Sequence, residues 1–125
     1  MSTLIVSNIT DGTTTVGTSY VVNGSAKAWL DYNQSGPTIE ASLNTSSVTD
    51  EAEGKFVQTF SSAMGSVNYS MVGMARGYHL IEDTDTNAKT AASFKVRSWY
   101  VSSTSGGRTN LDSHSNSVAT FGDLA

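Results

Sequence analysis

Cysteine is absent from this chain of 125 residues. Disulfides and thiolate metal sites are therefore excluded, and stability must come from the core or from partner chains. Charge is also scarce, since 14% of the residues are charged while 38% are hydrophobic. This balance excludes an acidic or basic disordered tail and is typical of a folded chain.

Basic residues and long apolar runs are lacking as well. The formal net charge is -4, so the chain has no basic footprint for a phosphate backbone and we expect no nucleic-acid partner. No apolar run approaches the length of a membrane span. The N-terminus also lacks the basic and apolar regions of a signal peptide, so we expect no contact with a membrane.

Hydroxyl side chains are abundant, because serine and threonine make up 36 of the 125 residues. The polar surface must therefore consist mainly of neutral hydroxyls. The length is that of one ordinary domain, which buries roughly two-thirds of the surface of its unfolded chain. No repeat or change in composition divides the chain. We expect an N-terminal arm over residues 1–18 and one domain over residues 19–125.

Short runs of β-branched and aromatic residues alternate with Gly, Asn, Asp and Ser, a spacing typical of an all-β domain. The predicted strands are Thr3–Ile9, Tyr20–Asn23, Ala26–Tyr32, Thr38–Leu43, Phe56–Phe60, Tyr69–Ala75, Tyr78–Ile81, Ser93–Ser102 and Ser117–Phe121. Residues Glu82–Ala92 lack strong strand signals and are expected to form a short helix or a long loop. The sequence therefore predicts an all-β fold, a single antiparallel β-sandwich of jelly-roll-like type with an extended N-terminal arm.

Two predicted strands carry a tryptophan on their polar face. In Ala26–Tyr32 alternation places Trp29 opposite the apolar residues, and in Ser93–Ser102 it does the same for Trp99. Such tryptophans, with Tyr100, would suit a platform for sugar rings. We favour the alternative that they cover a core edge or a seam between subunits, because aromatic residues are enriched at interfaces.

Catalytic residues are hard to assemble from this sequence. His79 lies in an apolar run, and His114 lies in a Ser/Asn loop near Asp112. With so many hydroxyls some Ser-His-Asp combination always occurs, whereas a real triad is defined by geometry. Acidic residues cluster in turns, as at Asp50–Glu51, and do not suggest a glycosidase pair. We therefore expect a protein that is not an enzyme.

One segment resembles the start of a calcium loop. Asp83, Asp85 and Asn87 are spaced as oxygen ligands. The sixth position is Ala88, where an EF-hand needs glycine, and the twelfth is Phe94, where it needs glutamate. An ordinary polar loop is the better interpretation, so we expect no metal and no cofactor.

Several segments, in order along nearly the whole chain, match a known pattern. They are Met-Ser-Thr-Leu-x-Val-x-x-Ile at residues 1–9, Gly24-Ser-Ala-Lys-Ala-Trp29 with Leu30-Asp-Tyr-Asn33, Leu43-Asn-Thr-Ser-Ser-Val-Thr-Asp50, the strand from Gly54 to Phe60, Ala63-Met64, Asn68-Tyr69 and Ser117-Val-Ala-Thr-Phe-Gly-Asp123. With these pieces the chain resembles the β-rich structural modules of tailed-bacteriophage tail fibre proteins, as found in phages of marine bacteria and cyanobacteria. It departs from the pattern at Ile5, where the family often has Lys, and at Glu51–Glu53, which replaces a Gly/Asn-rich turn.

The resemblance implies a virion structural protein on the exterior of a tailed-phage particle. Its copies would form a homotrimer, and that homotrimer would bind other virion proteins. It supplies no catalytic residue. Fibre proteins commonly carry a shaft or a receptor tip, and 125 residues leave no room for either. A tail fibre-type component is therefore the first expectation, and a capsid decoration or cement protein on the head is an alternative.

The expected contacts lie at two places. Leu4, Val6 and Ile9 of the arm are candidates for docking onto the particle, since a strand can add to the exposed edge of another chain's sheet. Trp29 and Trp99 are candidates for a seam between copies. The rival hypothesis is a module that binds host surface glycan through Trp29, Trp99 or Tyr100.

Overall fold

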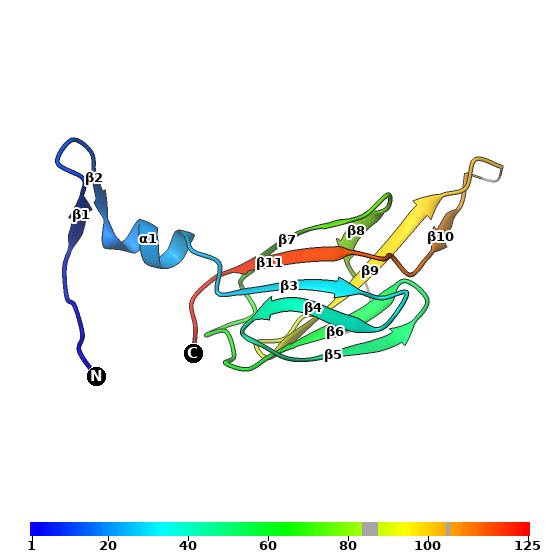
Figure 1. The fold of residues 1–125 in the computed structure, drawn as a ribbon, viewed down its shortest axis with the longest axis horizontal. Helices are drawn as coiled ribbons and strands as arrows, with labels where there is room; N and C mark the ends of the chain where they lie inside the picture. The colour runs from blue at the N-terminus through cyan, green and yellow to red at the C-terminus, as the bar shows by residue number, and fades with distance from the viewer. Residues whose placement is uncertain (84–87, 105) are drawn as a thin grey trace.

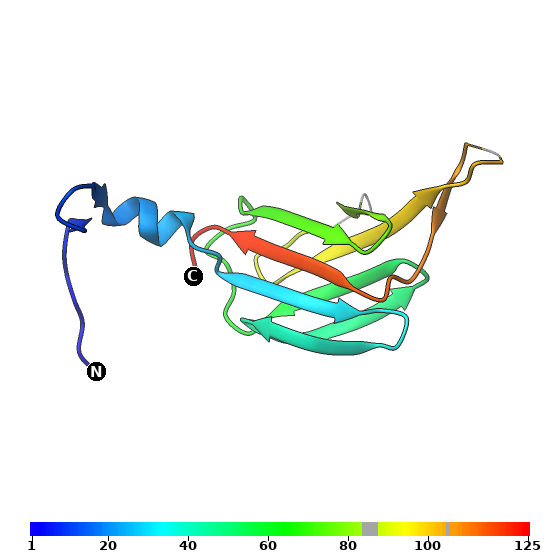
Figure 2. The ribbon, with the colours of Figure 1, turned by 45° about the horizontal axis from the view of Figure 1, so that its top comes forward.

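The computed structural model describes residues 1–83, 88–104 and 106–125. Two antiparallel sheets face each other, and an N-terminal segment projects from one end of them (Figure 1, Figure 2). The first sheet contains β3 (Ala28–Asn33), β4 (Thr38–Leu43), β7 (Ser70–Ala75) and β11 (Asn116–Phe121). The second contains β5 (Thr45–Ala52), β6 (Lys55–Phe60), β8 (His79–Glu82), β9 (Ser93–Val101) and β10 (Arg108–Asn110).

The strand order of the first sheet is β4-β3-β11-β7. The second has the order β10-β9-β6-β5, with β8 also paired to β9. The expected all-β, antiparallel sandwich is thus confirmed. Two hairpins, β3–β4 and β5–β6, each lie within one sheet.

The strands form where apolar residues alternate with polar ones. In β3 the side chains of Ala28, Leu30 and Tyr32 are buried, on the face that alternation in the sequence placed opposite Trp29. In β6 those of Phe56 and Phe60 are buried. Because successive residues of a strand point to opposite faces, this alternation fixes which face of each sheet turns inward.

Aromatic rings fill the space between the sheets. Tyr32 of β3 packs on Phe56 of β6 with ring centroids 5.0 Å apart. Phe60 packs on Tyr69 at 5.7 Å and on Phe94 at 5.6 Å. Each such buried side chain contributes about 1.5–3 kcal/mol. The Tyr32–Phe56 contact joins the two sheets, while Phe60 and Phe94 both belong to the second sheet.

The N-terminal segment lies outside the sandwich and differs from the prediction. It contains β1 (Asn8–Thr10), β2 (Thr15–Gly17) and a short helix α1 (Thr18–Gly24). The predicted strand Thr3–Ile9 begins only at residue 8, and the predicted strand Tyr20–Asn23 is helical. A strand needs a neighbour to bond with, and residues 18–24 have none, so their backbone groups bond locally. The projecting segment thus extends past residue 18, the boundary expected from sequence, to the end of α1.

Sequence reasoning missed β5. Its run of Ser and Thr, followed by Asp50 and Glu51, carries weak strand signals, but pairing with β6 recruits it into the sheet, with register shifts at two places. The segment Glu82–Ala92 begins at the last residue of β8, and its described residues 88–92 contain an isolated bridge at Lys89 and no helix. Residues 84–87 lie outside the described part.

The β5–β6 turn is fixed to the rest of the second sheet through Gly54. Its N–H donates to Asp112 Oδ1 at 2.7 Å, and its carbonyl oxygen accepts from the Ser98 N–H at 2.7 Å. Its φ is +68°, and a Cβ at this position would lie 2.4 Å from the Ser98 carbonyl oxygen. Only glycine fits this close approach of two backbones.

We expect Gly54→Ala to lower the free energy of unfolding by more than about 2 kcal/mol, because the clash adds to the cost of a positive φ. Gly77→Ala is the matched control, since Gly77 has φ +77° and a Cβ added there would meet no atom within 4 Å. It should cost about 1–2 kcal/mol. Urea unfolding of both variants measures the difference, and equal losses would contradict the crowding argument.

Tyr69 makes the stability of the fold depend on pH. Its hydroxyl lies within hydrogen-bond distance of the carbonyl oxygens of Thr90 and Ser93, at 2.9 and 3.0 Å. Burial, and then the charge of Glu82, raise the pKa of Tyr69 well above its ordinary value. Above the pKa of an unfolded tyrosine the unfolded chain releases this proton while the folded chain keeps it, so stability falls as the pH rises.

We expect Tyr69→Phe to cost about 1–2 kcal/mol at neutral pH through the lost hydrogen bond. Between about pH 9 and 11 it should lose less stability than the wild type, because the group that titrates is gone. Burial also raises the pKa of Tyr32, so part of the alkaline loss should persist. Thermal unfolding at stepped pH tests this, and parallel pH profiles for the two proteins would show that Tyr69 does not contribute.

Candidate functional site

The outward face of the first sheet carries a row of apolar side chains. The register pairs Leu43 of β4 with Trp29 of β3, Trp29 with Ala119 of β11, and Ala119 with Val72 of β7. Leu43, Trp29 and Val72 are exposed. In β3 and β11 the residues on either side of Trp29 and Ala119 are buried, so these two side chains lie on the solvent side of the sheet.

A second row lies beside the first and is more polar. It runs through Ala41, Asp31, Ser117 and Met74. Asp31 accepts a hydrogen bond from the Ser115 hydroxyl at 3.2 Å. Met74 is 76% exposed, which is unusual for a long apolar side chain, and it stands at the edge of the sheet.

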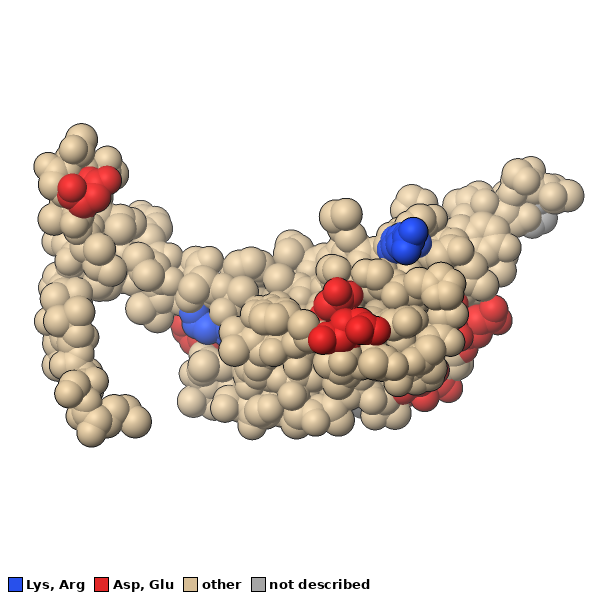
Figure 3. All heavy atoms as spheres, in the orientation of Figure 1, with Lys and Arg blue, Asp and Glu red and all other residues tan. Residues whose placement is uncertain are grey.

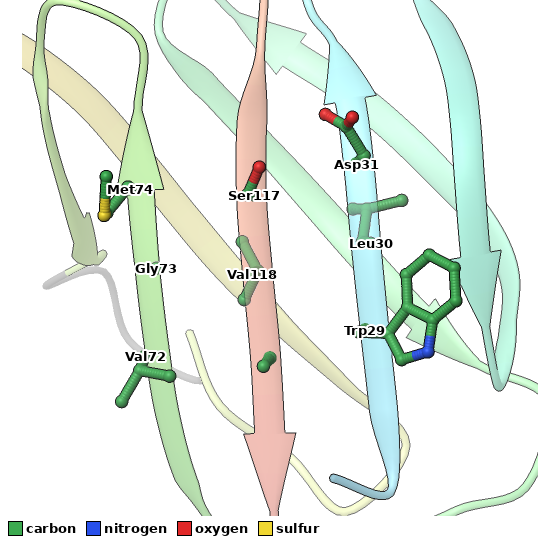
Figure 4. A pocket seen from close by; sticks show the side chains of 9 residues that line it. Trp29, Leu30, Asp31, Val72, Gly73, Met74, Ser117 and Val118 are labelled. Atoms are coloured by element: carbon green, nitrogen blue, oxygen red, sulfur yellow. The ribbon is translucent and has the colours of Figure 1, made fainter.

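The parts of the two rows on β3, β11 and β7 line a shallow groove of about 470 Å³ along β11. We call it the outer groove. The small side chains of Ser117 and Ala119 form its floor, while Trp29 on one side and Val72 and Met74 on the other form its walls (Figure 4). Its lining is mainly apolar, so it suits an apolar occupant better than a highly polar one.

Trp99 occupies a different environment on the outward face of the second sheet. The ring of His79 stacks on it with centroids 4.6 Å apart, and the Arg108 guanidinium lies 4.7 Å from its centroid. These two residues come from β8 and β10, the strands that pair with β9 at Trp99. The indole is therefore already in contact with both neighbouring strands.

The structure does not bring the predicted aromatic residues together. Trp29 and Trp99 lie on the outward faces of opposite sheets, and Tyr100 pairs with Tyr78 at 6.1 Å between ring centroids. A platform combining both tryptophans is excluded by this geometry. Of the two, Trp29 is the one that lines a groove, with 39% of its surface exposed.

The arm residues predicted to make contacts are open to solvent. Leu4 is 84% exposed, and Val6 and Ile9 are also exposed. The Thr18 N–H donates to the Ser7 carbonyl at 2.9 Å, which folds the segment on itself. The sequence analysis did not name Ile5 or the residues of α1 as candidates for contacts. Ile5, Tyr20 and Val22 are nevertheless exposed as well. No residue of α1 is buried.

The residues considered for catalysis have other partners or lie apart. His79 stacks on Trp99, His114 is exposed in its loop, and Asp112 accepts the Gly54 N–H. The three therefore do not form the hydrogen-bonded chain that a triad requires.

Asp83, the first residue of the candidate calcium loop, is buried in an ion-pair cluster. Its carboxylate lies 2.6 Å from Arg97 Nη2 and 3.5 Å from Lys55 Nζ. Asp85 and Asn87 lie outside the described residues. Among the residues that the structure does describe, no group of three or more His, Cys, Asp and Glu is placed to hold a metal ion.

Comparison with protein-family models, with curated proteins and with solved structures finds no match. In the described part of the chain, none of the helices has the length and hydropathy needed to cross a membrane. Inferences about function therefore rest on the surfaces described above and on the sequence.

The ion-pair cluster around Asp83 can be tested for a role in the stability of the fold. We expect Asp83→Asn to lower the free energy of unfolding by about 3 kcal/mol, because it removes a fully buried carboxylate that two cations contact. Glu51→Gln is the control, since the Lys95–Glu51 pair at 2.7 Å is partly exposed and should be worth less than about 1 kcal/mol. Chemical unfolding of both variants measures the difference, and a negligible effect at Asp83 would show that the cluster is not structural.

Proposed function

We propose that this chain is a non-enzymatic structural protein on the exterior of a tailed-phage particle, a tail fibre-type component that assembles as a symmetric oligomer. The observation that carries the proposal is that two apolar surfaces, the N-terminal segment and the outer groove, are left open by a single copy. Monomeric proteins rarely expose contiguous apolar surface unless it is used for binding. The likeness to phage fibre modules in the sequence supports the same role.

The distribution of charge also favours contacts with other protein chains. Figure 3 shows that the N-terminal segment and the adjoining face of the sandwich are mostly neither acidic nor basic. Asp11 is the single charged side chain within residues 1–24. Because burying unpaired charge is costly, uncharged surfaces of this kind are suited to burial in an interface.

The N-terminal segment is the proposed attachment element. Leu4, Val6 and Ile9 are exposed, and they belong to a segment that extends away from the sandwich (Figure 2). An extended apolar segment can bind a neighbouring chain without any change in the sandwich itself. Partners in this proposal are further copies of the chain, as in a homotrimer, and other virion proteins.

Two alternatives use the same surfaces differently. A capsid decoration protein would have the same contacts and a different place on the particle. A module that binds host glycan would use Trp29, because Trp99 already contacts His79 and Arg108. The apolar lining of the outer groove offers a sugar few hydrogen-bonding partners, which favours a protein contact.

Copy number in purified phage particles tests the role and the location. Quantitative mass spectrometry of this protein against the major capsid protein should give a ratio far below one, because fibres occupy only a few positions on a tail. A ratio comparable to the capsid protein would replace the fibre assignment with head decoration. Absence from the particles would overturn the structural role altogether.

A further inference from the structure

The N-terminal segment contains elements that are too short to be stable by themselves. Helix α1 has seven residues and no side-chain hydrogen bond at its N-cap, and β1 and β2 have three residues each. Isolated helices of this length are marginal in water, and so are isolated two-stranded hairpins. The hydrogen bonds described for residues 1–18 lie within the segment. The segment therefore needs packing contacts with another surface to be stable.

The outer groove also has apolar side chains that no described part of the same chain covers. Trp29, Val72 and Met74 form apolar walls that this chain leaves uncovered. Figure 4 shows these side chains standing on either side of β11, with a low floor between them. The groove is open along its length, so a segment lying in it would keep the outer side of its backbone in water.

The two surfaces match in chemistry. The segment offers Leu4, Ile5 and Val6 in succession, and the groove offers Trp29, Val72 and Met74. Asp31 is the charged residue in the groove lining, and the arm carries no acidic residue before Asp11. Burying one surface against the other therefore brings no like-charged side chains together.

We propose that the outer groove binds the N-terminal segment of a second copy of this chain, with Leu4 to Val6 lying between Trp29 and Met74. This inference rests on the proposed function, in which the segment attaches the sandwich to its neighbours, and it names both the neighbour and the binding surface. One type of contact then covers both of the apolar surfaces that a single copy exposes.

The geometry of such a contact restricts the assembly. Segment and groove are different surfaces of the chain, so the same contact can be made from each copy to the next. Repeated around a ring it closes into a cyclic oligomer, and a trimer is the form that agrees with the proposed function. Each copy then gives one arm and receives one.

Cysteine cross-linking tests this arrangement directly, because the native chain contains no cysteine. Leu4→Cys and Met74→Cys are made as two separate full-length proteins, mixed in equal amounts and oxidised. In the mixture a disulfide between Leu4→Cys and Met74→Cys can form only between copies. We expect this mixed product to exceed, by about tenfold, the product of Leu4→Cys with Val101→Cys, because binding raises the effective concentration of the two thiols. Val101 is an exposed control on β9.

Mass spectrometry of the cross-linked products separates the outcomes. A predominant Leu4→Cys homodimer would mean that the arms bind each other, and would overturn the proposal. Equal yields with Met74→Cys and Val101→Cys, or no covalent product at all, would also overturn it.

A second measurement does not depend on cross-linking. Val72→Asp places a charge on a groove wall, and Val101→Asp makes the same change at a strand residue of similar exposure, 56% against 51%. By sedimentation we expect Val72→Asp to raise the concentration needed for self-association at least about tenfold, a change of 1.4 kcal/mol per contact. Val101→Asp should leave it unchanged, and circular dichroism shows whether both variants are folded.

The outcomes of these tests can be distinguished from the outcomes that test the proposed role. Particles that contain the protein, together with a failed cross-link, would retain the virion function and reject the arm-in-groove contact. A positive cross-link with no protein in the particles would retain the contact and reject the virion role.

Discussion

The alternation of buried and less buried side chains in β3 and β11, the central strands of the first sheet, is the constraint on which the rest of the structure depends. Ala28, Leu30 and Tyr32 turn inward because the second sheet covers them. With a period of two, the residue between Ala28 and Leu30 must turn outward, and that residue is Trp29. The same rule on β11 sends Ser117 and Ala119 outward. The outer groove is thus the reverse side of the core.

The two sheets differ in how their outward faces are covered. On the second sheet long polar side chains cover the surface, with Arg97 and Lys55 around Asp83 and with Arg108 over Trp99. The outward face of the first sheet carries shorter or apolar side chains and leaves Trp29, Val72 and Met74 exposed. Two tryptophans in equivalent strand patterns therefore have different surroundings: Trp99 is packed by its own chain, while Trp29 lines a surface that a single copy leaves open.

The two ends of the molecule differ as well as the two outward faces, because the N-terminal segment lies at one end only. It leaves the sandwich at one end, while the β9–β10 hairpin projects at the other (Figure 1). Under the proposed function, this elongated subunit with an apolar arm and an apolar groove is a repeating part of a larger assembly. In such an assembly, much of the stability of the arm would come from neighbouring chains, because so little of it is buried within its own.

The sequence by itself determined most strands of the sandwich and the opposite faces of β3 and β9, because alternation is a local signal. It also indicated that Leu4, Val6 and Ile9 belong to an arm. It placed residues 20–23 in a strand, because Val21 and Val22 favour strands, and it missed β5, whose Ser and Thr residues do not. Tertiary structure decided both cases, since a strand exists only where a neighbouring strand can accept its hydrogen bonds. It also decided which tryptophan is covered and where the groove lies, because those depend on which strands become neighbours across a long distance in the chain.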